Sequence, residues 1–215
     1  MLAASCPAGP AFEGGEVKHG MPGYAGAIES LTISEDHSIK YKTISDQAPS
    51  GICGSGLIDV IAELRRTGQL NPLGVFTDNS KEFLIEKDRH ITIDRHDLSA
   101  LAQAKSANYC GQYIAAKKYG IQFSNVQTIF LAGAFANYIN ISNAQSIGLI
   151  PSINQSHFVR SGNASLLGAT ILLLSTKKRQ SLKALIKKIR HIELETEPDF
   201  FDIFVEGCMF QPMTN

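Results

Sequence analysis

The sequence predicts an α/β fold, with a mixed sheet and helices on both faces, on three observations. Strand-like and helix-like segments alternate through the second half of the chain. The continuous apolar run 126–132 has the character of a strand that is covered on both faces. With 215 residues, of which 44% are hydrophobic, the chain is long and apolar enough for a core. We expect one domain, in which the lead-in 1–26 joins the main body 27–215.

The first segments predict a loop, a hairpin and a helix. Residues 1–26 are rich in glycine and proline, as in a loop that approaches another group closely. Two β-like runs, 27–33 and 39–44, flank a polar stretch and predict a hairpin. A helix follows the glycine-rich segment 50–56 and ends near Gly68. Its spacing predicts four buried side chains: Leu57, Ile58, Ile61 and Leu64.

The middle of the chain predicts two short strands, 83–86 and 90–93, and then a long helix. This helix begins at Asp94, where Asp97 completes a capping-box-like arrangement, and it ends at Gly120. Its buried stripe is predicted at five positions: Leu98, Leu101, Tyr109, Tyr113 and Ile114.

The last third predicts short strands between helices. A short helix is expected to begin at a Ser142 cap, and the small residues Gly168 and Ala169 predict a close packing contact on a later helix. The remaining expected elements are a strand at 158–160, a helix at 164–175, a basic helix within 177–190, a strand at 189–194 and a helix at 200–210.

Charge and composition exclude several classes of protein. Twenty basic residues balance 20 acidic ones, so nucleic-acid binding has little electrostatic support. The basic stretch 177–190 is interpreted as the solvent-exposed face of an amphipathic helix. No apolar run in the sequence is long enough to cross a membrane. The apolar stripe of that helix is predicted at Leu182, Leu185, Ile186 and Ile189. We expect a cytoplasmic protein.

The four cysteines give no ligand pattern for a metal. Cys6, Cys53, Cys110 and Cys208 are far apart in the sequence, and no two have metal-ligand spacing. Free thiols in a reducing compartment are therefore expected, with no metal site in this chain.

Two glycine-rich loops lie where α/β proteins bind ligands. Gly54, Ser55 and Gly56 open a helix, whose free N–H groups and positive dipole end face outward, and the Ser55 hydroxyl suits a ribose or phosphate oxygen. Gly133–Asn137 follow the apolar run, where a small residue lets a planar base lie against the backbone. A glycine at a helix boundary is often only a turn, but the pair in this order favours nucleotide binding.

Three segments resemble the nucleotide-binding superfamily of actin, the sugar kinases and the heat-shock chaperones: CGSG at 53–56, LAGAFANYINISNAQSIGLIP at 131–151 and GNASLLGA at 162–169. Within it, three segments are similar to the C-terminal part of the reductive activators of corrinoid proteins: SCPAGPAFEGGEV at 5–17, PSGICGSGLIDVIAEL at 49–64 and IELETEPDFFDIF at 192–204. The resemblance implies one lobe of an actin-like (ribonuclease H-like) fold. In that family ATP hydrolysis drives reduction of cob(II)alamin to cob(I)alamin on a methyl-transfer protein.

The resemblance also implies roles for individual residues. Gly162 and Asn163 belong to a connecting region whose helix packs between the lobes and transmits closure. Glu13, the carboxylate of the segment 10–15, is a candidate for positioning a water or Mg²⁺, and a loop-stabilising hydrogen bond is the alternative. The implied nucleotide-binding residues are Gly54, Ser55, Gly56, Gly133, Ala134, Phe135 and Asn137.

The sequence departs from the family at the phosphate-binding groups. The superfamily holds phosphates and Mg²⁺ with Asp-x-Gly-Thr-type hairpins, and this chain has neither, so it should not turn over ATP efficiently alone. The ferredoxin-like domain with its iron–sulfur cluster is also absent, Ala136 stands where the family often has glycine, and the lone Cys208 cannot hold a cluster. We interpret the chain as an excised or truncated C-terminal lobe, and both an artificial and a native start at Met1 stay open.

The partners expected from this interpretation are a corrinoid protein, the missing N-terminal lobe and the ferredoxin-like domain, with a homodimer kept open. The ATP and Mg²⁺ would be held by the complete protein. Two other interpretations remain: a dimerisation or protein-interaction module that uses no nucleotide, and a lobe of another kinase-like ATPase or of a radical-dehydratase activator.

Overall fold

A computed structural model describes residues 1–213, apart from the side chain of residue 156. The strands are β1 (Leu2–Ala4), β2 (Ala27–Ile33), β3 (Ile39–Thr43), β4 (Gly51–Ile52), β5 (Glu82–Glu86), β6 (Ile91–Asp94), β7 (Ile129–Leu131), β8 (Phe158–Arg160) and β9 (Arg190–Ile192). The helices are α1 (Gly54–Arg66), α2 (Arg95–Tyr119), α3 (Ala134–Tyr138), α4 (Ile141–Ser146), α5 (Ala164–Leu174), α6 (Thr176–Ile186) and α7 (Phe200–Gly207).

The strands form four small sheets in the part of the chain that the structure describes. β2 lies between β3, which is antiparallel to it, and β4, which is parallel. β5 and β6 form an antiparallel hairpin, and β1 with β9 and β7 with β8 form parallel pairs. The α/β class and the predicted hairpin of β2 and β3 are confirmed, and the two short strands predicted near 83–93 are present as β5 and β6. The sequence predicted a single mixed sheet, whereas the structure has separate sheets. β1 pairs only with β9 and β7 only with β8 among the described strands, so neither pair joins the β3–β2–β4 sheet.

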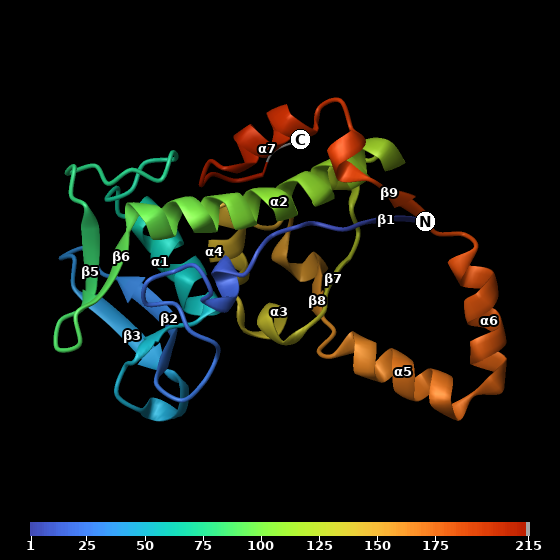
Figure 1. The fold of residues 1–215 in the computed structure, drawn as a ribbon, viewed down its shortest axis with the longest axis horizontal. Coiled ribbons are helices and arrows are strands. Elements are labelled where there is room, and N and C mark those ends of the chain that lie inside the picture. Colours follow the sequence, from blue (N-terminus) through green and yellow to red (C-terminus); the bar gives the residue numbers. More distant parts are fainter. Residues whose placement is uncertain (214–215) are drawn as a thin grey trace.

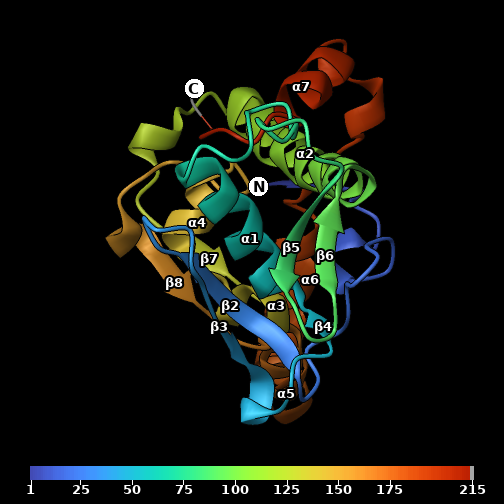
Figure 2. The same cartoon turned by 90° about the vertical axis from the view of Figure 1, so that its left-hand side faces the viewer.

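The centre of the molecule is a layer of helices against the β2–β3–β4 sheet, with α1 beside β2 and the long α2 crossing the body (Figures 1 and 2). α1 is enclosed almost to its end, and its four predicted core residues are all 0% exposed: Leu57, Ile58, Ile61 and Leu64. They belong to one hydrophobic cluster that includes the inward side chains of β2, β6 and α2.

A polar stripe on α1, made of Ser55, Asp59 and Glu63, also faces the interior. It hydrogen-bonds the backbone groups of β2 beyond the point where β4 stops pairing with that strand. The carboxylate of Asp59 accepts a hydrogen bond from the backbone N–H of Leu31 at 3.2 Å. One turn later Glu63 accepts from the N–H of Ile33 at 2.7 Å, and one turn earlier the Ser55 hydroxyl donates to a β2 carbonyl. Side chains four residues apart share one helix face, so this face replaces a neighbouring strand.

The ends of α2 follow the sequence signals. The Asp94 carboxylate accepts from the N–H groups of His96 and Asp97, and the Asp97 carboxylate accepts from the N–H of Asp94, which completes the capping box. Gly120 ends the helix in the left-handed conformation, with φ 76°.

A buried lysine on α2 holds the C-terminal segment. Lys105 is 0% exposed, and its ammonium donates to the carbonyl oxygen of Met209 at 2.7 Å and lies 5.3 Å from the ring centroid of Tyr109. Burial lowers the pKa of Lys105 from 10.5 to about 8. The segment is thereby joined to the middle of α2, about one hundred residues away in the sequence.

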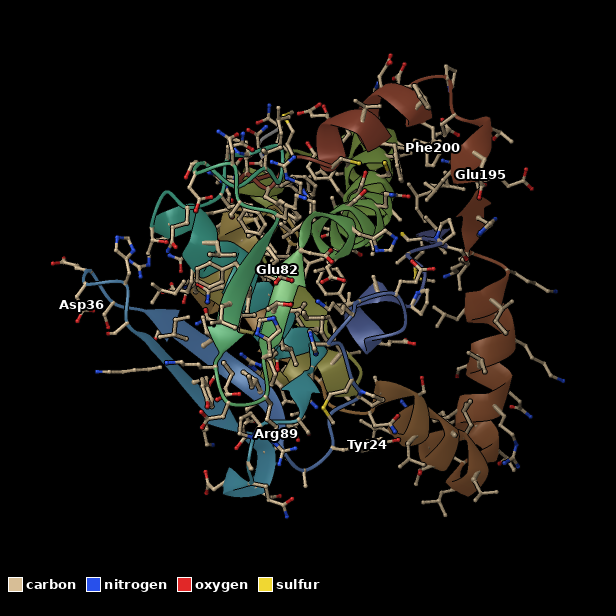
Figure 3. The ribbon with its side chains drawn as sticks, turned by 60° about the vertical axis from the view of Figure 1, so that its left-hand side comes forward. Tyr24, Asp36, Glu82, Arg89, Glu195 and Phe200 are labelled. Atoms are coloured by element: carbon tan, nitrogen blue, oxygen red, sulfur yellow. The ribbon has the colours of Figure 1, made fainter. Side chains whose placement is uncertain are left out.

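Helices α5 and α6 stand apart from the rest of the ribbon (Figures 1 and 3), and neither has a buried residue. The predicted packing contact at Gly168 and Ala169 is wrong, since a methyl group on Gly168 would meet nothing within 4 Å. The predicted apolar stripe of the basic helix α6 is also exposed to solvent, with Leu185 46% and Ile186 56% exposed. The reason is that these helices contact mainly each other. Within residues 1–213, none of the helices combines the length and apolarity that a bilayer crossing needs.

Two further expectations from the sequence are wrong in detail. The strand expected to be covered on both faces is short, and Phe130 at its centre is 68% exposed, so the face that carries this side chain is open to solvent. The cap of α4 is Asn140, whose side-chain oxygen accepts from the N–H of Asn143 at 3.2 Å, and Ser142 lies one residue inside the helix. The strands near 158–160 and 189–194 and the helix α7 are confirmed, with shorter bounds for the last two.

Candidate functional site

A cavity of about 580 Å³ lies where the N-terminal segment, the start of α1 and the helix α3 meet. The two glycine loops predicted from the sequence therefore share one site. The residues that line it are Phe12, Glu13, Met21, Pro22, Gly23, Glu29, Ile44, Cys53, Gly54, Ser55, Ala134, Phe135 and Tyr138.

The two glycines of the first loop are packed too tightly to be replaced by a residue with a side chain. A methyl group on Gly54 would overlap the carbonyl oxygen of Phe12 and the ring of Phe135, and one on Gly56 would overlap the carbonyl oxygen of Ile28. Gly54 thus lets three segments meet at the N-terminus of α1, whereas Gly56 lets α1 approach β2. Only the first of these glycines lines the cavity.

Ser55 is used inside the fold. It is 5% exposed, and its hydroxyl donates to the carbonyl oxygen of Glu29 at 2.8 Å. A hydroxyl has a single proton to donate, so this proton is not available to a phosphate or ribose oxygen in this arrangement.

The second glycine loop lies at the ends of two parallel strands. Gly133 follows β7 with φ 102°, a conformation that favours glycine, and its N–H donates to the carbonyl oxygen of Gly162 after β8 at 2.8 Å. Asn163 then caps α5 by accepting from the N–H of Leu166 at 2.9 Å. The predicted adenosine-loop and connecting residues are therefore neighbours at one edge of this sheet.

Arg160, at the end of β8, stabilises the second loop through hydrogen bonds to its backbone. Its guanidinium donates to the carbonyl oxygen of Ala136 at 3.2 Å, to that of Ile139 at 2.9 Å and to that of Asn137. Asn137 therefore takes part in loop structure through its backbone. The sequence reasoning missed Arg160, although an arginine that ends a short strand just before a glycine turn was a usable signal.

An aromatic pair joins the N-terminal segment to the second loop. The rings of Phe12 and Phe135 have centroids 6.0 Å apart at 41°. Phe12 belongs to a one-turn helix (Ala11–Glu13) that also carries the exposed Glu13, so the segment expected near the cleft does reach this site. Tyr138, at the end of α3, is 71% exposed and completes the cavity wall on that side.

The cavity is acidic and apolar. Glu13 and Glu29 contribute carboxylates to it, and its lining contains no lysine, arginine or histidine. The carboxylate of Glu29 lies 3.1 Å from the ammonium of Lys42, and this hydrogen bond raises the pKa of Lys42. No phosphate-binding cation therefore lines the cavity.

One cluster among the described residues has the composition of a metal site, namely Asp94, His96 and Asp97. Its carboxylates are already acceptors in the cap of α2, and the N–H of Lys18 also donates to Asp97 at 2.7 Å. The cluster is accounted for as a helix cap. All four cysteines are free thiols, as expected.

The whole chain, residues 1–215, matches the family model described as the C-terminal domain of RACo, the ASKHA domain. The chain belongs to this family. A corrinoid activation enzyme, RamQ, of Eubacterium limosum is 36% identical over 96% of this chain. A methylated amine-specific corrinoid protein reductase of Methanosarcina barkeri is 22% identical over 95% of it.

A solved structure of the same family confirms the fold. The reductive activator for corrinoid, iron–sulfur protein matches 98% of this ASKHA chain with a TM-score of 0.87 and 34% identity. The chain spans 39% and 41% of the lengths of the two curated relatives and 36% of the solved one. The resemblance read from the sequence is thereby confirmed, as is the actin-like nucleotide-binding fold class.

Proposed function

We propose that the chain is the lobe of an ATP-dependent reductive activator that supplies the adenosine side of the nucleotide cleft. The observation that carries this proposal is the convergence of Gly54, the loop 133–137 and the N-terminal segment on one cavity in a chain of this family. The complete activator would restore cob(I)alamin on a corrinoid methyl-transfer protein. A one-electron donor, an iron–sulfur cluster held elsewhere in the activator, would reduce cob(II)alamin, and ATP hydrolysis would drive that uphill transfer.

The chemistry of the lining supports a division of labour. The apolar wall suits a base, while phosphates need cations that the cavity lacks. Mg²⁺ would neutralise phosphate charge when bound, and Glu13, an exposed carboxylate at the cavity, has the oxygen ligand that Mg²⁺ prefers. The chain's own residues would bind and orient the nucleoside, and the Asp-x-Gly-Thr-type groups would come from another lobe.

The path from the cleft to the rest of the activator would run through Gly162 and Asn163. These residues join β8 to α5, which stands outside the packed body, so a change at the second loop would reach α5 directly. Closure of the cleft would then reposition α5 against the partner lobe.

The test is to join this chain to the part of the Eubacterium limosum enzyme that precedes the matched region. We expect the fusion to hydrolyse ATP, with a rate that rises when a corrinoid protein is added, and to generate the cob(I)alamin absorption spectrum when supplied with a reductant. A folded fusion that binds its iron–sulfur cluster but hydrolyses no ATP would contradict the proposal.

The bare apolar hairpin α5–α6 favours a second candidate, a dimerisation module. Sedimentation of the chain alone distinguishes the two: a dimer whose stability is indifferent to adenosine and to ATP would favour the module.

A further inference from the structure

The basic residues of this chain are concentrated in one stretch. Of the 20 lysine and arginine residues, 11 lie between residues 98 and 192, where the sequence contains no aspartate or glutamate. Seven of these 11 belong to α6, to the turn after it and to the start of β9, and all seven are exposed: Lys177, Lys178, Arg179, Lys183, Lys187, Lys188 and Arg190. None of the seven has an acidic partner among the described residues.

The folding of α6 does not explain these charges. The helix dipole disfavours cations at the start of a helix, yet Lys177 and Lys178 lie in the first turn and no acidic residue does. Exposed helices usually carry both signs of charge, whereas α6 carries one. Arg179 has a structural role, since its guanidinium donates to the carbonyl oxygens of Leu172 and Leu173 at 2.6 and 3.1 Å. We call the other six the α6 basic surface: Lys177, Lys178, Lys183, Lys187, Lys188 and Arg190.

The end of α2 shows how this chain covers basic residues elsewhere. Lys117 pairs with Asp199, and the ammonium of Lys118 lies 2.7 Å from the carboxylate of Glu197. The covering segment, 193–206, is rich in acidic residues and also buries apolar side chains against α2. A surface complementary to α6 would have the same chemistry, carboxylates around an apolar centre.

The α6 basic surface has the layout of a protein-binding surface. Leu182, Leu185 and Ile186 are three and four residues apart and share one side of α6. At 3.6 residues per turn, Lys177 and Lys183 lie on opposite sides of this apolar stripe. An apolar centre with a charged rim is typical of protein–protein interfaces. The stretch 164–190 has no aromatic residue, whereas membrane-surface helices and single-strand binders rely on aromatic side chains. The partner is therefore an acidic protein surface.

We propose that the α6 basic surface docks an acidic face of the corrinoid protein. The inference rests on the proposed function and names the surface through which the activator meets its partner. An activator binds and releases its partner in every cycle, and complementary charges raise the association rate without a large interface. α6 contacts α5, which begins after the Asn163 cap beside the second glycine loop. Docking on α6 thus reaches the nucleotide cleft through one helix.

The test is calorimetric titration of the fusion described above with the corrinoid protein used to stimulate it, in its cob(II)alamin form. We expect binding to weaken at least about tenfold when the salt concentration rises from about 50 to about 300 mM, because salt screens exposed charges. Lys177→Glu combined with Lys178→Glu and Lys183→Glu should weaken binding at least about tenfold at the lower salt concentration. Glutamate forms helices as readily as lysine and is favoured in the first turn, so α6 keeps its structure.

The matched control is Lys81→Glu combined with Lys87→Glu and Arg89→Glu. These exposed residues lie beside β5 and in the turn between β5 and β6, at the opposite end of the molecule from α6 (Figure 1). Both triple variants change the net charge by the same amount. The control should bind the corrinoid protein within about twofold of the unaltered fusion, since distant exposed charges are screened.

Four results would overturn the inference: no binding of the corrinoid protein, binding that salt does not change, an α6 variant that binds as tightly as the unaltered fusion, or an equal loss in both triple variants. Binding to phosphatidylserine vesicles or to duplex DNA that the α6 variant loses, while it keeps the corrinoid protein, would assign the surface to a membrane or to nucleic acid and also overturn it.

Failure of the proposed function gives a different result. A folded fusion that hydrolyses no ATP contradicts that function, whether or not it binds the corrinoid protein. A fusion whose ATP hydrolysis rises with the corrinoid protein, and rises equally at every concentration in the α6 variant, contradicts the inference alone.

Discussion

Helices α1 and α5 have similar lengths and many aliphatic residues, yet only α1 is enclosed. Ile58 and Ile61 of α1 are 0% exposed, whereas Leu173 and Leu174 of α5 are 77% and 80% exposed. α1 lies between β2 and the core, while α5 has α6 as its main neighbour among the described residues. A helix that is apolar on all sides is normally covered. The difference shows that a sequence pattern predicts the helix but not the surface that covers it.

The largest difference between the two helices is expected from one substitution made in each. Gly56→Ala puts a methyl group onto the carbonyl oxygen of Ile28 and 2.9 Å from a methyl of Ile52. α1 must then move away from β2, at a cost of about 3 kcal/mol or more in the free energy of unfolding. Urea denaturation followed by circular dichroism measures this cost.

Gly168→Ala in α5 is the matched control. Nothing lies within 4 Å of the added methyl group, and alanine favours a helix interior over glycine by about 1 kcal/mol. Hydrogen exchange of the α5 amides should therefore slow. A loss of global stability in this variant as large as that in Gly56→Ala would show that α5 is packed after all.

The burial of Lys105 is expected to make the stability of the protein depend on pH. Burial lowers the pKa of Lys105 to about 8, while lysine in the unfolded chain keeps its ordinary pKa of 10.5. The unfolded state therefore holds more protons between these values, and the stability of the wild type rises with pH across this window. The rise relative to Lys105→Met should approach at most about 3 kcal/mol.

Denaturation of both proteins from pH 7.5 to 10.5 tests this expectation. Cys110, whose pKa burial raises to about 11, titrates in both proteins, so its effect largely cancels in the difference. A difference that is constant with pH would mean that Lys105 is solvated in the native state.

Removing one polar group of the α1 stripe should have a somewhat smaller effect. Asp59→Ala leaves the N–H of Leu31 and the side-chain amide of Asn143 without their acceptor, at a cost of about 2 kcal/mol. Burial raises the pKa of Asp59, so its contribution is full below the unfolded value of 3.8 and declines as pH rises through the native value. The penalty should therefore be larger at pH 4 than at pH 7.

The control for this substitution is Asp88→Ala on the exposed turn between β5 and β6, which should change stability by less than about 0.5 kcal/mol. Equal effects of the two substitutions would show that the β2 edge does not depend on α1.

The sequence was informative where structure is set by neighbouring residues. The capping box at Asp94 and Asp97, the hairpin 27–43 and the helix that starts at Gly54 all follow from local signals. The polar stripe of Asp59 and Glu63 was missed, because carboxylates at helical spacing normally face solvent, and here they meet a strand edge about 30 residues away.

The features of the candidate site also fall into those that were predicted from the sequence and those that were not. Its glycine loops and the N-terminal segment were predicted from composition and resemblance, and the cavity brings them together. The Phe12–Phe135 contact, the support from Arg160 and the carboxylate of Glu29 were not predicted, since each joins segments that are distant in the sequence. The assignment of individual nucleotide-binding residues stays a prediction.

The smallest effect on stability is expected on α5. Leu173→Gln combined with Leu174→Gln replaces two side chains that are already in solvent, so the free energy of unfolding should change by less than about 0.5 kcal/mol. The same pair should reduce self-association, because exposed leucines on neighbouring helices form an adhesive apolar surface. Sedimentation velocity at increasing concentration measures this, with Ile58→Gln in α1 as the contrasting variant that should unfold the chain. If the α5 pair lowers stability as much as a core substitution, α5 is covered in solution and the contrast with α1 disappears.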